Sequence, residues 1–361
     1  MHRPKLAASL LFAATVLGAC SDGATAPATS RSPSLSAREV EMSPATIRLG
    51  YFSKSPVVAM AQTHGFFADQ NLTVVENQTP SSPTIFRNLR DGQWDVILTQ
   101  IDNVFNYRLN PSNPLGGTFE PVAFIGTDWG NGASLMARPE YTTVESLRGK
   151  TVAVDSPNSG FAFVLYGIMR AHGLERGVDY NVVVTGGTPG RYADLVAGKF
   201  DATILNSGYQ FRAADAGMQT LGNIPDAASP FMGGSGVALR SWLDRNPDAA
   251  IRFLRAYIRG QRYVLDPANK DEVIAWLTAD SGSPLVAQKT YDVLTTPGDG
   301  LIPNAEIDRQ GLFGTASLRD SFGGFDTPQN IDWLTSPASG VFDLKYWRRA
   351  ELSQGWETDT F

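Results

Sequence analysis

The stretch Leu89-Arg90-Asp91-Gly92-Gln93-Trp94-Asp95-Val96 ends a predicted helix, turns on glycine and begins a predicted strand. The same pattern returns at Leu195-Val196-Ala197-Gly198-Lys199-Phe200-Asp201-Ala202. Around both stretches, short apolar strands alternate with helices, which is typical of parallel sheets joined by right-handed crossovers. The doubled pattern therefore predicts an α/β protein built from two similar units.

Outward from these stretches, the alternation predicts a first unit and then a second unit of roughly 100 residues. We expect strands at 46–51, 72–76, 95–99, 121–126, 134–137, 151–154, 181–185 and 201–205. We expect helices at 56–64, 82–90, 102–107, 142–147, 159–171 and 190–197. The last third of the chain is predicted to be mainly helical.

A long helix is predicted to begin at Asn246-Pro247-Asp248. This run supplies an N-cap side chain, a proline at the first helical position and an acid that favours the helix dipole. The buried stripe of this helix is marked by Ile251, Leu254 and Ile258, and the opposite side carries Arg252, Arg255, Arg259 and Arg262. The arginine side is either a solvated face or a docking surface for a partner protein.

The N-terminus is typical of a bacterial secretion signal, because Arg3 and Lys5 precede an apolar run that ends at Ala19. Cys20, the single cysteine, follows Leu17-Gly18-Ala19, and this arrangement resembles a lipobox, in which the thiol receives a diacylglycerol. We predict a lipoprotein signal peptide at 1–19 and a lipid-anchored disordered tether at 20–44, which is rich in Ser, Ala, Thr and Pro. The alternative is an ordinary signal peptide with an incidental cysteine.

The composition excludes several classes of function. Removal of Arg3 and Lys5 with the signal peptide takes the formal net charge from −6 to −8, which argues against a nucleic-acid partner. Three histidines and one cysteine in the whole chain argue against a metal site, and no cofactor is expected. After the signal, no stretch approaches the roughly 18 apolar residues that a membrane-spanning helix needs.

Several segments resemble one known family. They are Ile47-Arg48-Leu49-Gly50-Tyr51, then Gly65-Phe66-Phe67-Ala68-Asp69-Gln70-Asn71-Leu72, the two Leu…Gly…Asp stretches quoted above, and Leu147-Arg148-Gly149-Lys150-Thr151-Val152-Ala153-Val154. In this order they are similar to segments of the substrate-binding lipoproteins of ABC importers, in the group that binds sulfonates, taurine and thiamine precursors. The resemblance covers residues 46–280, and the segment after residue 280 carries little of it.

The resemblance implies a two-lobed α/β fold like that of type II periplasmic binding proteins, with a ligand cleft between the lobes and a two-strand hinge. Lobe 1 would comprise 45–135 and return over 234–361 with C-terminal helices, and lobe 2 would comprise 136–233. Gly233-Gly234-Ser235-Gly236 is either the return hinge, since glycine absorbs backbone rotation, or a surface loop. The resemblance also implies a monomer on the periplasmic side that delivers a small solute to an ABC permease.

We predict ligand contacts just after the strands, because ligands of open α/β sheets bind beyond the carboxyl ends of strands. In lobe 1 these residues are Tyr51, Phe52, Ser53, Ser55, Thr79, Ser81, Gln100, Asp102, Asn103, Trp129 and Asn131. In lobe 2 they are Ser156, Asn158, Ser159, Gly160, Phe161, Gly187, Thr188, Asn206 and Tyr209. The loop from Asp155 to Gly160 is the strongest cluster, because it opens a helix whose free amides can hold an oxygen-bearing ligand.

The charge of the solute is the open question. The helix starts at 156–160 and 186–190 favour an anion such as a sulfonate or taurine. Asp102, Asp128 and Asp155 oppose one, with only Lys54 and Arg191 as nearby cations, and the aromatic residues favour a flat ring. We expect a neutral or cationic heterocycle, such as a thiamine precursor, with a sulfonate as the alternative.

Two other classes of function compete with import. An enzyme is disfavoured, because the chain has neither a Gly-x-Ser-x-Gly elbow nor a His-Glu-x-x-His motif, although a triad using His64 or His172 is not excluded by sequence. A ligand-sensing surface lipoprotein has the same sequence features as an importer component. The gene neighbourhood separates these two, since a permease and an ATPase favour import and a kinase favours sensing.

Overall fold

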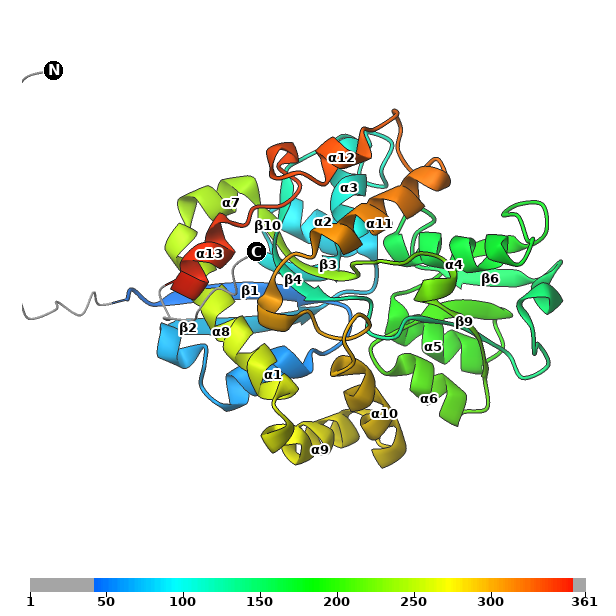
Figure 1. The fold of residues 1–361 in the computed structure, drawn as a ribbon, viewed down its shortest axis with the longest axis horizontal. Helices are drawn as coiled ribbons and strands as arrows, with labels where there is room; N and C mark the ends of the chain where they lie inside the picture. The colour runs from blue at the N-terminus through cyan, green and yellow to red at the C-terminus, as the bar shows by residue number, and fades with distance from the viewer. Residues whose placement is uncertain (1–41, 353–361) are drawn as a thin grey trace, which may run out of the picture. The chain divides into compact units, whose positions relative to one another are not determined.

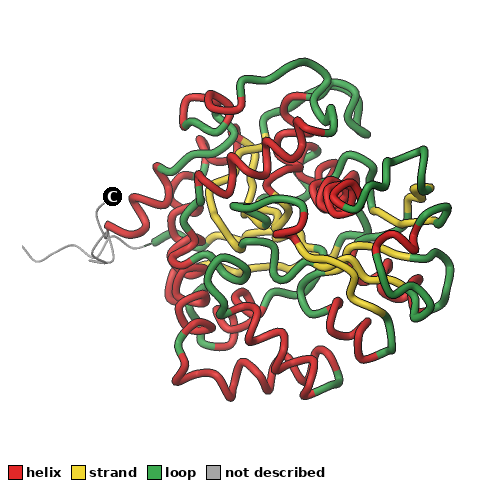
Figure 2. The backbone as a smooth tube through the Cα atoms, turned by 45° about the vertical axis from the view of Figure 1, so that its right-hand side comes forward, coloured by secondary structure: helices red, strands yellow, loops and turns green. Residues whose placement is uncertain are grey.

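The computed structural model describes residues 42–352. The predicted signal peptide, Cys20 and all but the last three residues of the predicted tether lie outside the described residues. Two five-stranded sheets are surrounded by helices (Figure 1), and the strands of both sheets are yellow in Figure 2. The architecture is therefore the two-unit α/β fold that the sequence predicts.

The first sheet has the strand order β2-β1-β3-β10-β4. Its strands are β1 (Ala45–Tyr51), β2 (Leu72–Gln78), β3 (Val96–Gln100), β4 (Pro121–Asp128) and β10 (Gly234–Leu239). Ile47 and Leu49 of β1 are buried with Phe253 and Leu254 of α8 (Pro247–Leu265). We call this sheet and its helices lobe 1.

The second sheet has the strand order β7-β6-β8-β5-β9. Its strands are β5 (Ser134–Ala137), β6 (Thr151–Val154), β7 (Asn181–Val184), β8 (Ala202–Leu205) and β9 (Gln219–Asn223). Val152 and Ile204 are buried beneath Phe163 and Tyr166 of α4 (Gly160–Ala171). We call this sheet and its helices lobe 2.

The expectation of parallel strands is wrong for β5, and β10 is an antiparallel strand in a segment where the sequence predicts a hinge or a loop. Strand β10 pairs antiparallel with β3 and β4, and β5 pairs antiparallel with β8 and β9. The reason is the route of the chain, which passes between the sheets over residues 129–133 and again over 224–233. The carboxyl ends of the parallel strands in the two sheets face each other, so a strand that enters a sheet from the other one runs against its neighbours.

The helices agree with the predicted alternation. Lobe 1 carries α1 (Pro56–Thr63), α2 (Ser82–Arg90), α3 (Ile101–Leu109), α7 (Arg240–Arg245), α8 and α13 (Lys345–Leu352). Lobe 2 carries α4, α5 (Thr188–Val196) and α6 (Tyr209–Asp215), while α9 (Lys270–Ser281), α10 (Pro284–Leu294), α11 (Arg309–Ser321) and α12 (Ile331–Leu334) follow in the C-terminal part. The helix expected at 142–147 is a 3₁₀ turn at Val144–Leu147, and α5 begins two residues earlier than predicted because Pro189 fits the first turn.

Helix α8 begins as predicted, but two details of the prediction are wrong. The Asn246 side chain does not cap the helix and instead donates to the Trp242 carbonyl at 2.9 Å. The arginine side is not simply solvated, since Arg252 is 2% exposed and donates to the Gln70 carbonyl at 2.6 Å. The cause is the turn at 68–70, which covers this side of α8 and presents carbonyl groups to it.

A buried arginine joins α11 to both lobes. Arg319 is 0% exposed, and its guanidinium donates to Asp102 Oδ2 at 2.7 Å and to Asn106 Oδ1 at 2.7 Å, both in α3 of lobe 1. It also donates to the Asn158 carbonyl of lobe 2 at 3.2 Å. The segment after residue 280 therefore fastens α3 to the loop before α4.

Substitution Asp102→Asn is expected to lower the free energy of unfolding by about 3–5 kcal/mol, because it leaves the Arg319 charge buried without its carboxylate. Denaturant unfolding at neutral pH measures the loss. The matched control is Asp69→Asn, whose pair with Arg259 is half-exposed and contributes about 1 kcal/mol or less. Equal losses in the two variants would contradict the structural role of the buried pair.

Candidate functional site

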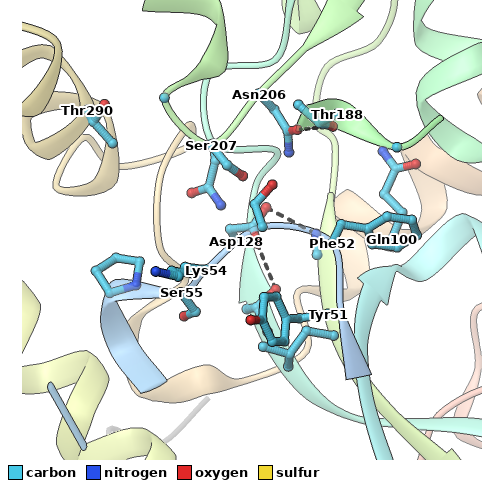
Figure 3. Close-up of a pocket in the computed structure, with 18 of the residues that line it drawn as sticks. Tyr51, Phe52, Lys54, Ser55, Gln100, Asp128, Thr188, Asn206, Ser207 and Thr290 are labelled. Carbon is cyan, nitrogen blue, oxygen red and sulfur yellow. Dashed lines mark hydrogen bonds between the residues drawn. The ribbon is translucent and has the colours of Figure 1, made fainter. Parts of the chain in front are cut away.

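A cavity of about 160 Å³ lies between the facing strand ends of the two lobes. Lobe 1 contributes the segment after β1, the end of β3 and Asp128 at the end of β4. Lobe 2 contributes the loop after β6, the start of α5 and the residues after β8. Figure 3 shows Tyr51, Lys54 and Ser55 across the cavity from Thr188 and Asn206, with Asp128 between them.

Many of the predicted ligand contacts meet at this cavity, because they follow strands that end at it. The predicted residues that line it are Tyr51, Phe52, Ser53, Ser55, Gln100, Asn103, Asn131, Ser159, Phe161, Gly187, Thr188 and Asn206. The predicted residues that do not line it are Thr79, Ser81, Asp102, Trp129, Ser156, Asn158, Gly160 and Tyr209.

Two of the residues outside the cavity lining have structural partners elsewhere. Asp102 is turned to Arg319, and burial raises the pKa of its carboxyl while the guanidinium partly offsets that rise. Trp129 donates from Nε1 to Asp308 Oδ2 at 2.8 Å, so its ring is held against the C-terminal part of the chain. Neither residue is available to a ligand in this arrangement.

The other residues outside the lining serve local structure. Ser81 caps α2 by accepting from the Thr84 amide, and Thr79 donates to the Ser81 carbonyl at 3.1 Å. The carbonyl groups of Ser156 and Asn158 accept bonds from Ser159 and Arg319, and Tyr209 lies under the Arg212 guanidinium. Gly160 packs directly against lobe 1, since a Cβ there would lie 1.9 Å from Gln100 Oε1.

Sequence reasoning missed one wall of the cavity. Helices α9 and α10 line it with Trp276, Leu277, Asp280, Ser281, Val286, Thr290 and Leu294. No sequence signal points to them, because they follow no strand and lie beyond the end of the family resemblance or close to it. Other lining residues missed are Ser82, Arg212 and Tyr257, while Asp128, Asp155 and Arg191 entered only as nearby charges.

Two of the carboxylates at the cavity are paired with cations. Asp280 pairs with the guanidinium of Arg212, and Lys54 Nζ lies 3.8 Å from its other oxygen. Asp155 Oδ1 lies 3.9 Å from Nη1 of Arg191, a residue that is 2% exposed. Two carboxylates are thus set against three cations, so these groups carry no excess of negative charge.

Asp128 is the exception among the cavity carboxylates. Its oxygens accept from the Gly130 amide at 2.9 Å, the Gly234 amide at 3.2 Å and the Thr127 hydroxyl at 2.7 Å. Within residues 42–352 no lysine, arginine or histidine lies within 4.0 Å of it. Burial raises the pKa of Asp128, and the three hydrogen bonds oppose that rise because they favour the ionised form.

Several polar atoms of the lining have no hydrogen-bond partner in the described part of the chain. Gln100 Nε2 and Arg212 Nε are donors of this kind, and Asn103 Oδ1 and Asn131 Oδ1 are acceptors. Buried polar groups are normally paired, so unpaired ones at a cavity are available to a ligand. Tyr51, Phe52, Phe161, Tyr257 and Trp276 add aromatic surface. The cavity is thus suited to an organic solute that carries both donors and acceptors.

The described residues offer no alternative centre of another kind. Between Met42 and Leu352 no group of three His, Cys, Asp or Glu side chains is placed to hold a metal ion. Over the same range no helix is long and apolar enough to cross a membrane. His64 and His172 lie away from the cavity, where they bond to Glu272 at 2.8 Å and to Glu145 at 2.7 Å.

Two α/β lobes whose strand ends face each other across a cavity define the class of periplasmic binding proteins. Residues 41–278 match the NMT1-like family, which is most of the chain. The chain belongs to the NMT1-like family. A search of curated protein sequences returns no significant match.

Solved structures of similar fold include three periplasmic binding proteins, each of low sequence identity. The periplasmic nitrate-binding protein NrtA from Synechocystis PCC 6803 is 14% identical with a TM-score of 0.69, covering 86% of this chain and 89% of that one. The alkanesulfonate-binding protein SsuA from Xanthomonas axonopodis pv. citri, bound to MOPS, is 16% identical with a TM-score of 0.64, covering 83% and 98%. The periplasmic aliphatic sulphonate binding protein SsuA from Escherichia coli is 19% identical with a TM-score of 0.59, covering 80% and 91%. These matches confirm the predicted periplasmic-binding-protein fold.

Substitution Gly160→Ala is expected to lower the free energy of unfolding by about 1–3 kcal/mol, because the added methyl would overlap Gln100 and would lie 2.7 Å from Asp102 Cβ. The matched control is Gly190→Ala in the first turn of α5, where nothing lies within 4 Å of the added carbon. That control should gain about 0.4–1 kcal/mol from reduced chain entropy. Denaturant unfolding of both variants gives the comparison, and a stabilised Gly160→Ala protein would contradict the close contact.

Proposed function

We propose that this chain is the extracytoplasmic solute-binding component of an ABC importer. The observation that carries the proposal is the cavity between the lobes, which gathers unpaired donors, unpaired acceptors and aromatic side chains at one place. A protein with two lobes can close over a small solute by hinge motion and present the closed form to a permease. Membership of the NMT1-like family and the fold likeness to nitrate- and sulfonate-binding proteins support the same function.

For the solute, we infer a neutral or cationic heterocycle of the thiamine-precursor kind. Asp128 supports a donor or cation, because its buried carboxylate is bonded only to neutral groups among the described residues. Tyr51, Phe161 and Trp276 give a flat ring surfaces on which to stack. Gln100 Nε2 and Asn103 Oδ1 supply the directional contacts that fix the orientation of a ring with nitrogen atoms.

The alternative is an aliphatic sulfonate or taurine. The fold likeness to the two sulfonate-binding SsuA proteins supports it, and so does the Nε of Arg212, which has no partner among the described residues. Against it stand Asp128 and the fact that Arg212 already pairs with Asp280. A buried anion beside Asp128 would repel its carboxylate at a large cost in free energy.

We propose a binding role without catalysis, in keeping with membership of the NMT1-like family. For cellular location, we propose export to the periplasmic side, attachment through a lipid at Cys20 and delivery of the solute to a permease by a monomer. These features rest on the N-terminal sequence and on the family resemblance.

The solute class is tested by thermal unfolding of the purified full-length protein with pyrimidines, flavins, cationic amines, alkanesulfonates and taurine. A ligand at one hundred times its dissociation constant stabilises a protein by about 2.7 kcal/mol, which is visible in the melting temperature. We expect a hit among the heterocycles and at least a tenfold loss of its affinity in Asp128→Asn. Asp271→Asn, an exposed carboxylate outside the cavity, is the matched control and should bind normally.

A sulfonate hit that survives Asp128→Asn would contradict the solute class while leaving the binding function in place. If no compound in the library raised the melting temperature, the result would count against a receptor for these solutes. That result would favour the sensing or interaction alternative.

Substitution Cys20→Ser is expected to move the protein from the membrane fraction to the soluble exported fraction, because the serine hydroxyl does not accept the lipid that the thiol receives. Fractionation of cells with immunodetection measures this. Ser21→Ala, one position further on, keeps the cysteine and is the control. A membrane-bound Cys20→Ser protein would show that the anchor lies elsewhere.

A further inference from the structure

Three helix starts meet at one end of the cavity. Ser82 is the first residue of α2, Ser159 is the N-cap of α4, and Gly187 is the N-cap of α5. The Gly187 amide donates to the Pro80 carbonyl at 2.6 Å, which brings α5 of lobe 2 against the start of α2 of lobe 1. Free amides and the helix dipole make such a place attractive to an anion.

The carboxylate of Asp155 already occupies this place. Its Oδ2 accepts from both the amide and the hydroxyl of Ser82, with the amide nitrogen at 3.1 Å, and its Oδ1 accepts from the Ser159 hydroxyl at 2.7 Å. Asp155 is 7% exposed. One side chain of lobe 2 therefore accepts hydrogen bonds from the start of α2 in lobe 1 and from the N-cap hydroxyl of α4 in its own lobe.

A buried guanidinium faces the same carboxylate. Arg191 is 2% exposed and donates to four neutral oxygens: the Thr203 and Thr188 hydroxyls and the Gly186 and Ile204 carbonyls. Among the described residues, Asp155 is the carboxylate that lies within 4.0 Å of it, at 3.9 Å. A buried cation is costly without a nearby anion. The Asp155 carboxylate therefore stabilises the buried charge of Arg191 in a way that a neutral side chain does not.

A further donor shows that this end of the cavity is open to a ligand. Gln100 is 7% exposed and lines the cavity, and its Nε2 has no partner in the part of the chain that the structure describes. Amides, hydroxyls, a guanidinium and this carboxamide together form the donor set of an oxyanion site. In this chain the oxyanion is supplied by the protein itself.

We propose that Asp155 is a built-in anion, which fills the oxyanion site formed by Ser82, Ser159 and Arg191 and thereby selects against anionic solutes. An anionic group at this end would have to displace Asp155 or lie beside it. Both routes are costly, since the first leaves a buried carboxylate without its donors and the second brings two negative charges together. The inference deepens the proposed function, because it names the residue that sets the charge of the solute.

The test is to empty the site and offer it small anions. Asp155→Ser removes the carboxylate from the Arg191 end of the cavity. Asp128→Ser removes a carboxylate from the same cavity at a place where none of the described lysines, arginines or histidines lies within 4.0 Å. The melting temperatures of the full-length wild type and of both variants are measured with nitrate and with methanesulfonate. Gluconate at equal ionic strength is the bulky reference anion, and titration calorimetry gives the affinities.

We expect a lowered melting temperature for Asp155→Ser and a saturable recovery with nitrate or methanesulfonate. The affinity for these anions should be at least tenfold higher than in the wild type or in Asp128→Ser. The double variant Asp155→Ser with Arg191→Met should lose the recovery, because the buried cation is then gone. Asp155→Ala, which also empties the site, replaces Asp155→Ser if the serine variant does not fold.

Two results would overturn the proposal: no saturable recovery in the Asp155 variants, or anion affinity in the wild type equal to theirs. Neither depends on finding the natural solute. A failed solute screen with successful anion recovery would count against a receptor for the solutes tested and leave the role of Asp155 intact. A solute hit without anion recovery would support the proposed function and overturn the role of Asp155.

Discussion

The hydrogen bonds of Asp128 are the constraint on which the site depends. Its Oδ1 accepts from the amides of Gly130 and Gly234, which lie in or next to the two segments that connect the lobes. The same carboxylate lines the cavity. Asp128 therefore joins the two connecting segments to each other at the cavity. A Cβ at Gly234 would lie 2.1 Å from Asp128 Oδ2, which is why the second crossing segment has glycine at this point.

The electrostatics of the cavity follow from which carboxylates are neutralised. Asp280 has Arg212 and Lys54, Asp155 has Arg191 and two helix starts, and Asp128 has only neutral donors among the described residues. The sequence predicts that these aspartates lie near the ligand. It does not show which of them are neutralised by a cation, and therefore does not give the net charge of the site. Asp102 demonstrates the difference: it lies in the chain between Gln100 and Asn103, which line the cavity, yet its carboxylate is paired with Arg319.

Sequence reasoning predicted the parts of the fold and of the site that depend on local pattern. The alternation of strand, turn and helix fixes where Tyr51, Gln100, Ser159 and Asn206 fall, so the sequence predicts them at the site, and all four line the cavity. Contacts made by distant segments were not predictable in the same way. Arg319 meets Asp102 across more than two hundred residues, and Trp276 and Thr290 reach the cavity from helices that have no strand before them. No short-range sequence pattern predicts such long-range contacts, because they depend on how the helices and strands pack against one another.

The position of β10 has a consequence for the order in which the chain can fold. It lies between β3 and β4 in the first sheet, yet the whole of the second sheet is synthesised before it. The edges of β3 and β4 that face β10 therefore stay unpaired until residues 234–239 have been made. Long-range pairing of this kind is slow because loop closure precedes the stabilising contacts. A chain truncated before residue 234 would leave both edges open to aggregation.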